Sequence, residues 1–264
     1  MRIALIGYGA IARAVHTGLR TDAQALIRQV LVRETRCAAI RQATGDDVGV
    51  ISSVDALHTD TRFVLECAGH EAVRAYGAEI LARGISLGIV SVGVLADDEL
   101  HEALRRAAAG SGAQLVILPG AIGGTDAIAA AGPENLTMVT YTGRKPPMAW
   151  AGSPAEDQFD LAGITEPTVL FSGTAREAAR QYPKNANVVA TVALAGRGFD
   201  DTKVSLVADP GANGNTHEIA ARGPLLDFSF TTGGRPLAAN PRTSALTAMS
   251  AVRTLRNLTG TVVV

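Results

Sequence analysis

The start of the chain carries the pattern that most restricts its fold. An apolar run at residues 3–6 leads directly into Gly7-Tyr-Gly-Ala-Ile-Ala12, and a helical pattern follows. In such a strand-to-helix turn the first glycine permits the tight bend, the second lets the backbone approach a pyrophosphate, and the small third residue lets helix pack on strand. An ordinary glycine turn is the alternative. The residues expected to contact a dinucleotide here are Gly7, Gly9, Ala10 and Ile11.

Strands and helices alternate through the rest of the first half. Expected strands cover residues 29–32, 63–69, 85–92 and 114–118, and expected helices cover residues 70–83 and 97–110. This alternation predicts parallel βαβ units, whose ligands bind beyond the carboxyl ends of the strands. Small residues stand at several of these ends, as a cofactor close to the backbone requires. They are Ala68, Gly69, Ser91, Gly93 and residues 119–124.

The predicted fold class is α/β, with a Rossmann-type doubly wound parallel sheet over residues 1–121. Residues 122–240 indicate a separate α+β domain with a mixed or antiparallel sheet. Its expected strands are residues 136–142, 201–208, 217–222 and 226–231, while residues 187–195 fit a helix or a strand equally well. Residues 241–264 predict a final helix, opened by residues 241–244, that returns to the first domain.

Arg33 follows the second expected strand, where an enzyme that prefers NAD usually has an acidic residue for the ribose hydroxyls. An arginine there favours the 2′-phosphate of NADP, and Arg36 is close by in sequence. The cofactor is therefore expected to be NAD or NADP, with NADP favoured. The alternative is that both arginines are solvated residues at the start of a helix.

The composition excludes several classes of partner. The net charge is −1 over 264 residues, which argues against nucleic acid or a membrane surface held by bulk electrostatics. No apolar run is long enough to span a bilayer, and the first strand leaves no room for a removable signal peptide, so we expect a cytoplasmic protein. Cys37 and Cys67 lack the neighbouring ligands of a metal site and are expected to be reduced structural residues.

The densest group of polar functional side chains lies in Tyr182-Pro-Lys-Asn-Ala-Asn187, with His217 further on among polar turn residues. A cation, two carboxamides and a histidine suit the binding and chemistry of a small anion. Lys184 and Asn185 are the expected substrate contacts. Arg144 and Lys145 are weaker candidates, because the predicted loop at residues 143–147 equally suits solvent or a second subunit. The alternatives are a surface lysine at Lys184 and a hydrogen-bonded structural histidine at His217.

Several motifs together resemble the L-aspartate dehydrogenase family along nearly the whole chain. The Tyr182–Asn187 motif and Asn215-Thr-His217 are far more specific than the glycine turn. The other matching pieces are the glycine turn itself, Leu118-Pro-Gly-Ala-Ile-Gly-Gly124, Thr142-Gly-Arg-Lys-Pro-Pro147 with Trp150, residues 171–179, Ala208-Asp-Pro210, Pro236-Leu237 and residues 240–247.

The resemblance implies reversible oxidative deamination of L-aspartate to oxaloacetate and ammonia, by way of iminoaspartate that feeds NAD synthesis. It implies that His217 is catalytic and that Ala121 and Asn187 contact the cofactor. It also implies a homodimer, with L-aspartate, oxaloacetate and ammonia as small-molecule partners. No metal is expected from the residues. By its residue type alone, Asn187 is equally an asparagine that caps a helix.

Two other functions stay open on the sequence. The first is an NAD(P)-dependent reductase of another aspartate-derived metabolite, which would not require ammonium. The second is a nicotinamide-nucleotide sensor that binds the cofactor without turnover. In a sensor, substitution of Lys184 and His217 would leave cofactor affinity unchanged.

Overall fold

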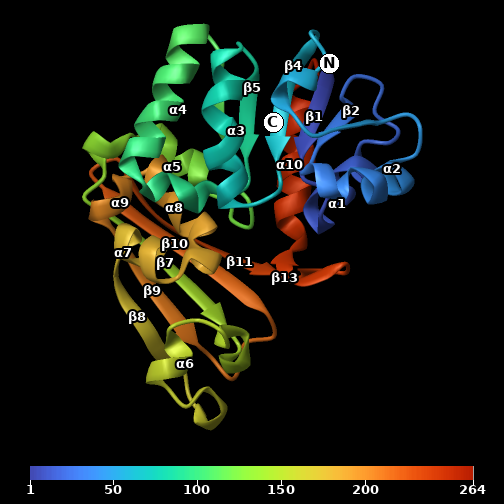
Figure 1. The fold of residues 1–264 in the computed structure, drawn as a ribbon. Helices are drawn as coiled ribbons and strands as arrows, with labels where there is room; N and C mark the ends of the chain where they lie inside the picture. Colours follow the sequence, from blue (N-terminus) through green and yellow to red (C-terminus); the bar gives the residue numbers. More distant parts are fainter. Residues whose placement is uncertain (264) are drawn as a thin grey trace. The chain divides into compact units, whose positions relative to one another are not determined.

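The computed structural model describes residues 1–263, with the backbone alone described at Lys184, Pro241 and Arg242. The chain forms two compact units (Figure 1). Unit 1 comprises Met1–Leu118 together with Thr247–Val264, and unit 2 comprises Pro119–Leu246. Unit 1 is therefore built from both ends of the chain.

Unit 1 contains a six-stranded sheet in the order β3-β2-β1-β4-β5-β6, and every neighbouring pair is parallel. The chain starts in the middle of this sheet and builds outward in both directions. A parallel sheet with that order confirms the doubly wound Rossmann-type fold, whose switch point lies between β1 and β4. The strands are β1 (Arg2–Ile6), β2 (Leu26–Leu31), β3 (Gly49–Ile51), β4 (Thr61–Glu66), β5 (Ser86–Ile89) and β6 (Leu115–Ile117).

The helices of unit 1 connect these strands. They are α1 (Ala10–Gly18), α2 (Cys37–Thr44), α3 (His70–Ala82), α4 (Asp98–Ser111) and most of α10 (Ala245–Asn257), with 3-10 turns at Glu34–Arg36, Val54–Ala56 and Val92–Ala96. Asp97 caps α4 by accepting a hydrogen bond from the Leu100 amide at 3.2 Å. The predicted end of that helix at Gly110 is wrong, because Gly112 is the glycine that adopts the left-handed conformation.

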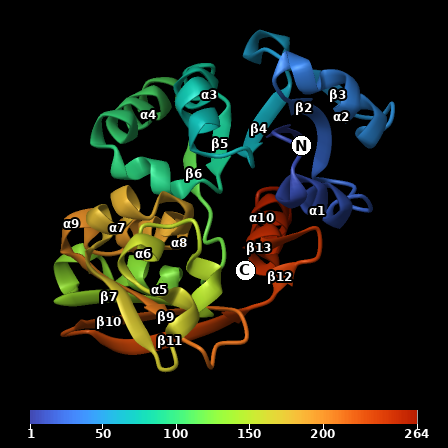
Figure 2. The ribbon, with the colours of Figure 1, turned by 60° about the horizontal axis from the view of Figure 1, so that its bottom comes forward.

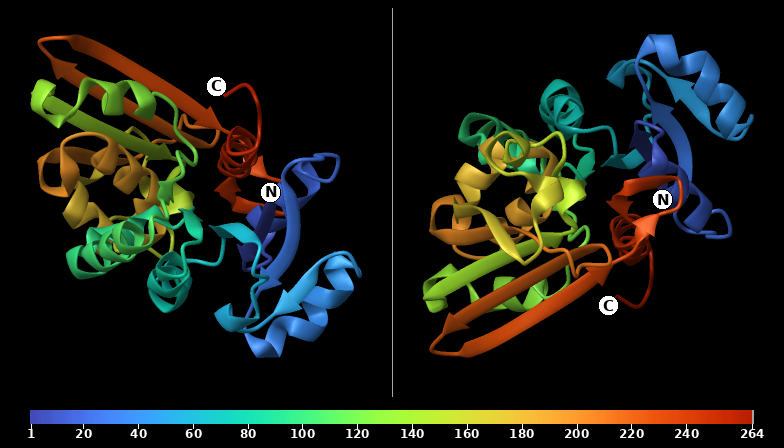
Figure 3. Two further views of the ribbon diagram at one scale, coloured as in Figure 1. Left: turned by 90° about the horizontal axis from the view of Figure 1, so that it is seen from above. Right: turned by 90° about the horizontal axis from the view of Figure 1, so that it is seen from below.

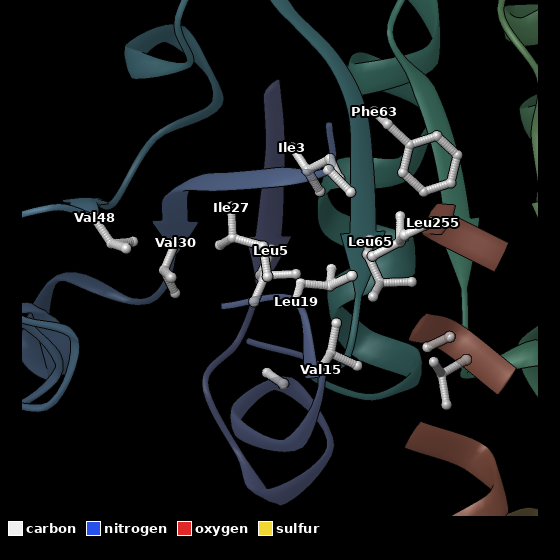
Figure 4. Packing of buried hydrophobic residues seen from close by; sticks show 14 of the residues in the cluster. Ile3, Leu5, Val15, Leu19, Ile27, Val30, Val48, Phe63, Leu65 and Leu255 are labelled. Carbon is white, nitrogen blue, oxygen red and sulfur yellow. The ribbon is translucent and has the colours of Figure 1, made fainter. Parts of the chain in front are cut away.

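The core of unit 1 takes side chains from β1, β2 and β4, and the C-terminal helix adds Ala251 and Leu255 (Figure 4). Helix α10 also approaches α1 closely. A Cβ atom on Gly18 would lie 2.9 Å from a methyl group of Val252, and Arg256 donates to the Gly18 carbonyl at 3.0 Å. The absence of a side chain at Gly18 thus allows the two helices to meet.

Unit 2 contains a five-stranded sheet in the order β11-β10-β7-β9-β8. The β7–β9 pair is parallel and the other pairs are antiparallel, which confirms the mixed sheet. Helices α7 and α8 lie along one face of it (Figure 2). The strands are β7 (Met138–Lys145), β8 (Thr168–Thr174), β9 (Thr202–Ala208), β10 (Asn215–Gly223) and β11 (Leu226–Gly234).

The helices of unit 2 include α8, which settles the ambiguous run at residues 187–195 as a helix. Thr174 and Glu177 form a capping box at the start of α7. The helices are α5 (Thr125–Ala131), α6 (Ala155–Gln158), α7 (Ala175–Gln181), α8 (Ala186–Ala195) and α9 (Gly198–Asp201), with 3-10 turns at Pro133–Asn135, Pro147–Trp150, Leu161–Gly163 and Pro183–Asn185.

Two predicted boundaries in the second half are wrong. Strand β7 continues past Gly143 to Lys145, because β10 and β9 pair with it on both sides. Residues 240–244 do not open the last helix. They form β13 (Asn240–Ser244), which pairs with β12 (Pro236–Leu237), and the helix begins at Ala245 (Figure 3). No helix among residues 1–263 is long and apolar enough to cross a membrane.

We expect Leu255→Ala to lower the free energy of unfolding by about 2–5 kcal/mol, because it empties a fully buried position in the core of unit 1. Urea unfolding followed by circular dichroism measures the change. Leu258→Ala is the matched control, because Leu258 is 40% exposed and its truncation should cost less than about 1 kcal/mol. Equal costs for the two variants would contradict the packing of α10 described above.

Candidate active site

A pocket of about 640 Å³ lies at the carboxyl ends of β1, β2 and β4 in unit 1. Four of the predicted cofactor residues line it, namely Gly7, Gly9, Arg33 and Ala68. Ala10 and Ile11 begin helix α1, and Gly69 directly precedes helix α3. The strand ends thus bring these residues to one edge of the sheet, where doubly wound folds bind ligands.

Gly7 has a structural reason to be glycine. Its φ is 81°, and a Cβ atom there would lie 2.7 Å from the Cβ atom of Ala68. In the part of the chain that the structure describes, no side chain caps helix α1 at Gly9, and no acidic residue lies in its first turn. The backbone amides of that helix therefore suit an anionic group such as a pyrophosphate.

Glu66 is a buried carboxylate at the end of β4 that the sequence reasoning missed. It accepts hydrogen bonds from the amides of Ala68 at 2.6 Å and Gly69 at 2.7 Å, and from the amide and hydroxyl of Ser91, both at 3.0 Å. These bonds fix the turn after β4 against the end of β5. A charged residue inside the apolar run of residues 63–69 was the available signal.

Cys67 and Cys37 are both free, as predicted. Burial, and then the neighbouring Glu66 carboxylate, raise the pKa of the Cys67 thiol well above its ordinary value. A thiol of that kind stays protonated and is a poor nucleophile. The residues described contain no cluster of three His, Cys, Asp or Glu side chains arranged to hold a metal ion.

Arg33 and Arg36 line the same pocket beside Leu31 and Val32, at the end of β2. In the doubly wound fold this strand end meets the adenosine ribose. Two guanidinium groups there suit a phosphate on the ribose better than a bare hydroxyl. Gly7 and Gly9, the uncapped start of α1 and these two arginines together fit a nicotinamide dinucleotide.

Unit 2 holds a polar cluster made of Tyr141, Lys145, Asn185 and His217. His217 lies on β10 with only 7% of its surface exposed, and its Nδ1 atom is 2.7 Å from the Tyr141 hydroxyl. Gly143 lies opposite His217 in the sheet, and a Cβ atom there would be 2.8 Å from that hydroxyl. A glycine at position 143 therefore makes the Tyr141–His217 hydrogen bond possible.

Lys145 ends strand β7, and its ammonium group donates to the side-chain oxygen of Asn185. The ammonium nitrogen also lies 4.7 Å from the centre of the Trp150 ring, as a cation–π contact requires. Burial lowers the pKa of Lys145 to about 8. Lys145 therefore belongs to the cluster, and its assignment to a loop is wrong because β7 extends through it.

The ionisation of His217 follows from its surroundings. Burial, and then the nearby charge of Lys145, lower the pKa of His217 to about 4. Burial raises the pKa of Tyr141. The imidazole is therefore neutral at neutral pH, and its Nδ1 atom is engaged by Tyr141.

The other candidate residues fall as follows. The side chain of Lys184 lies outside the described residues, and its backbone is in the turn Pro183–Asn185. Asn187 lies in the first turn of α8, and Ala121 is buried near the start of unit 2. Arg144 forms an ion pair with Asp209 at 3.7 Å and is not part of the cluster.

We expect unit 2 to lose stability as the pH falls from about 6.5 to 4. The pKa of His217 is lower in the folded than in the unfolded state, so the unfolded chain binds the proton first and protonation favours unfolding. The contribution is about 3 kcal/mol over that range. Trp150 is the one tryptophan of the chain and lies in unit 2, so its fluorescence during urea unfolding reports the change. His217→Gln should have a clearly flatter pH dependence, and an unchanged slope would contradict the burial argument.

Comparison with known families covers both units. Residues 126–258 match the family model described as aspartate dehydrogenase, C-terminal. Residues 7–118 match the model described as homoserine dehydrogenase, NAD binding domain. The second match agrees with the cofactor pocket built from the strand ends of unit 1, and it shows an NAD-binding domain.

Individual relatives match over nearly the full chain. An L-aspartate dehydrogenase of Cupriavidus necator is 47% identical over 260 residues, covering 97% of each chain. One of Ruegeria pomeroyi is 48% identical over 256 residues, covering 97% of this chain and 92% of the relative. The crystal structure of aspartate dehydrogenase from Thermotoga maritima superposes with a TM-score of 0.79 at 26% identity, covering 100% and 99% of the two chains. Since the likeness extends over both the nucleotide pocket and the His217 cluster, this chain belongs to the L-aspartate dehydrogenase family.

Proposed function

We propose that this protein catalyses the reversible, NAD(P)-dependent oxidative deamination of L-aspartate to oxaloacetate and ammonia through iminoaspartate. The observation that carries the proposal is the buried pair of His217 and Tyr141 beside the cation of Lys145. A neutral imidazole next to a cation suits proton transfer on a substrate that carries two carboxylates. The family membership supports the same substrate.

The cofactor, when bound, accepts the hydride from the substrate Cα atom. We assign its pyrophosphate to Gly7, Gly9 and the first turn of α1, because these backbone amides are open to an anion. Arg33 is assigned to the ribose end, since it lines the pocket at the end of β2. The remaining proposed cofactor contacts are Ala10, Ile11, Ala68, Gly69, Ala121 and Asn187.

His217 is the proposed catalytic base. With Nδ1 engaged by Tyr141, the Nε2 atom is the one that exchanges protons. In the deamination direction it takes a proton from the water whose oxygen adds to the imine carbon, and it returns that proton to the nitrogen of the resulting carbinolamine. The C–N bond then breaks, ammonia leaves, and the hydroxyl loses its proton to give the ketone. Entry of a dicarboxylate adds negative charge nearby and raises the pKa of His217, so the imidazole becomes a stronger base once the substrate is bound.

Asn185 and Lys184 are the proposed substrate contacts. The position of Asn185 beside the Lys145 ammonium group supports its part, because an amide held there can donate to a carboxylate oxygen. The support for Lys184 is its place in the motif of residues 182–187, which the family resemblance covers.

Three finer features belong to the proposal through the family resemblance. They are a homodimeric state, a cytoplasmic location, and a supply of iminoaspartate to NAD synthesis. Light scattering on the purified protein tests the first of them.

We expect purified protein to oxidise NADPH or NADH with oxaloacetate only when ammonium is present. His217→Ala should lower kcat/KM by about 100- to 10,000-fold, because it removes the group that moves the protons. The absorbance of the reduced cofactor follows the reaction. Turnover without ammonium would indicate a reductase of another metabolite, and cofactor binding without any turnover would indicate a sensor. Either result would overturn the proposed function.

We expect Arg33→Ala to lower kcat/KM with NADPH by about 10- to 100-fold, because it removes a charge-assisted hydrogen bond to the 2′-phosphate. The value with NADH should change by less than about threefold. Arg62→Ala is the control, because Arg62 is an exposed arginine at the other end of β4. An equal loss with both cofactors would mean that Arg33 does not read the 2′-phosphate.

A further inference from the structure

Lys145 is a largely buried cation. No carboxylate of the described residues forms an ion pair with it. Among the described residues, Lys145 contacts the neutral side chain of Asn185 and the face of the Trp150 ring. Buried charges in folded proteins are normally paired, because an unpaired charge loses its hydration without compensation. The lowered pKa of Lys145 has the same cause, which is lost hydration of the ammonium group. An anionic ligand would supply the missing charge.

The position of Lys145 places it in the same site as His217. Residues 141, 143 and 145 share one face of β7, since side chains alternate along a strand. His217 lies opposite Gly143 on the neighbouring strand and carries the electrostatic influence of Lys145. Arg144, between them in sequence, pairs with Asp209 instead. The unpaired cation therefore stands beside the proposed catalytic base.

Asn185 adds a second donor. Its side-chain oxygen accepts from Lys145, which turns the Nδ2 group of the amide away from the ammonium nitrogen. An ammonium group and an amide NH₂ group side by side match the two oxygens of one carboxylate. The ammonium group gains more from a charged oxygen than from a neutral one.

We propose that Lys145, in its protonated form, is the receptor for one carboxylate of a four-carbon dicarboxylate substrate, with Asn185 as the second donor. This inference rests on the proposed function and names a residue of its binding site. If the inference is correct, the affinity for the dicarboxylate depends on the charge of Lys145.

The other titratable groups of the cluster do not obscure the link between succinate binding and the charge of Lys145. His217 is neutral in the free protein well below pH 7, and the Tyr141 hydroxyl stays protonated above its ordinary range. The Asp209 carboxylate is engaged by Arg144. The side chain of Lys184 lies outside the described residues. Between pH 7 and 9.5, Lys145 is therefore the described member of the cluster that changes charge.

The test is calorimetric titration of succinate into the full-length protein saturated with oxidised cofactor. Succinate has both carboxylates but neither the amine nor the ketone, so it reports binding without turnover. Since the ligand binds the protonated lysine, affinity should be present at pH 7 and decline above pH 8. A pKa of about 8 gives a rise in Kd of about 30-fold between pH 7 and 9.5.

Three variants sharpen the test. Lys145→Met should weaken succinate binding at pH 7 by about 10- to 100-fold and remove the pH dependence. Lys145→Arg keeps the charge and should bind succinate with little change up to pH 9.5, because a guanidinium does not lose its proton there. Lys203→Met is the control for the same substitution at an exposed lysine on β9, and it should bind as the wild type does. Circular dichroism verifies the fold of each variant.

Wild-type affinity in Lys145→Met, or a Kd that does not move between pH 7 and 9.5, would overturn the inference. Ammonium-dependent turnover is measured separately on the wild type. If the wild type turns over but succinate binding does not depend on Lys145, this inference is wrong and the proposed function stands. Lys145-dependent binding without turnover sinks the proposed reaction and leaves a dicarboxylate site.

Discussion

The hydrogen bond between Tyr141 and His217 is the interaction around which the chemistry of unit 2 is arranged. It joins neighbouring strands β7 and β10 across a position where Gly143 has no side chain, so sheet pairing and side-chain geometry depend on one another. Burial then makes the imidazole neutral, and the same burial leaves the nearby lysine short of solvation. One packing arrangement therefore accounts for the protonation state of two groups.

Unit 1 places a charged group at a strand end in a different way. Glu66 is as buried as any core residue, yet four donors from two turns satisfy it. A carboxylate that is fully hydrogen-bonded stabilises the backbone around it and offers little to a ligand. Lys145 has the opposite character, with its charge only partly compensated. Glu66 therefore stabilises the shape of its site, whereas the charge of Lys145 is left to bind a ligand.

The sequence predicted the doubly wound sheet because the turn after β1 and the alternation of strands and helices depend on local patterns. Prediction from the sequence failed where pairing partners distant in the chain determine the local structure. Lys145 looked like a loop residue because Gly143 and Pro146 lie close to it in sequence, and only its pairing with β9 extends the strand through it. Residues 240–244 looked like a helix start, but pairing with β12 makes them a strand. Glu66 was missed because burial of a carboxylate cannot be inferred without its donors. The catalytic assignment of His217 came from the family motif, since its spacing alone also fits a structural histidine.

The division of unit 1 between the two ends of the chain has a consequence for synthesis on the ribosome. Unit 2 is one continuous segment, Pro119–Leu246, and all of its strands are synthesised before α10. The core of unit 1 lacks Ala251 and Leu255 until α10 has left the exit tunnel. The N-terminal part of the nascent chain therefore waits with an incomplete core while the inserted unit has its full sequence. The nucleotide-binding unit can therefore complete its core only after unit 2 has been synthesised.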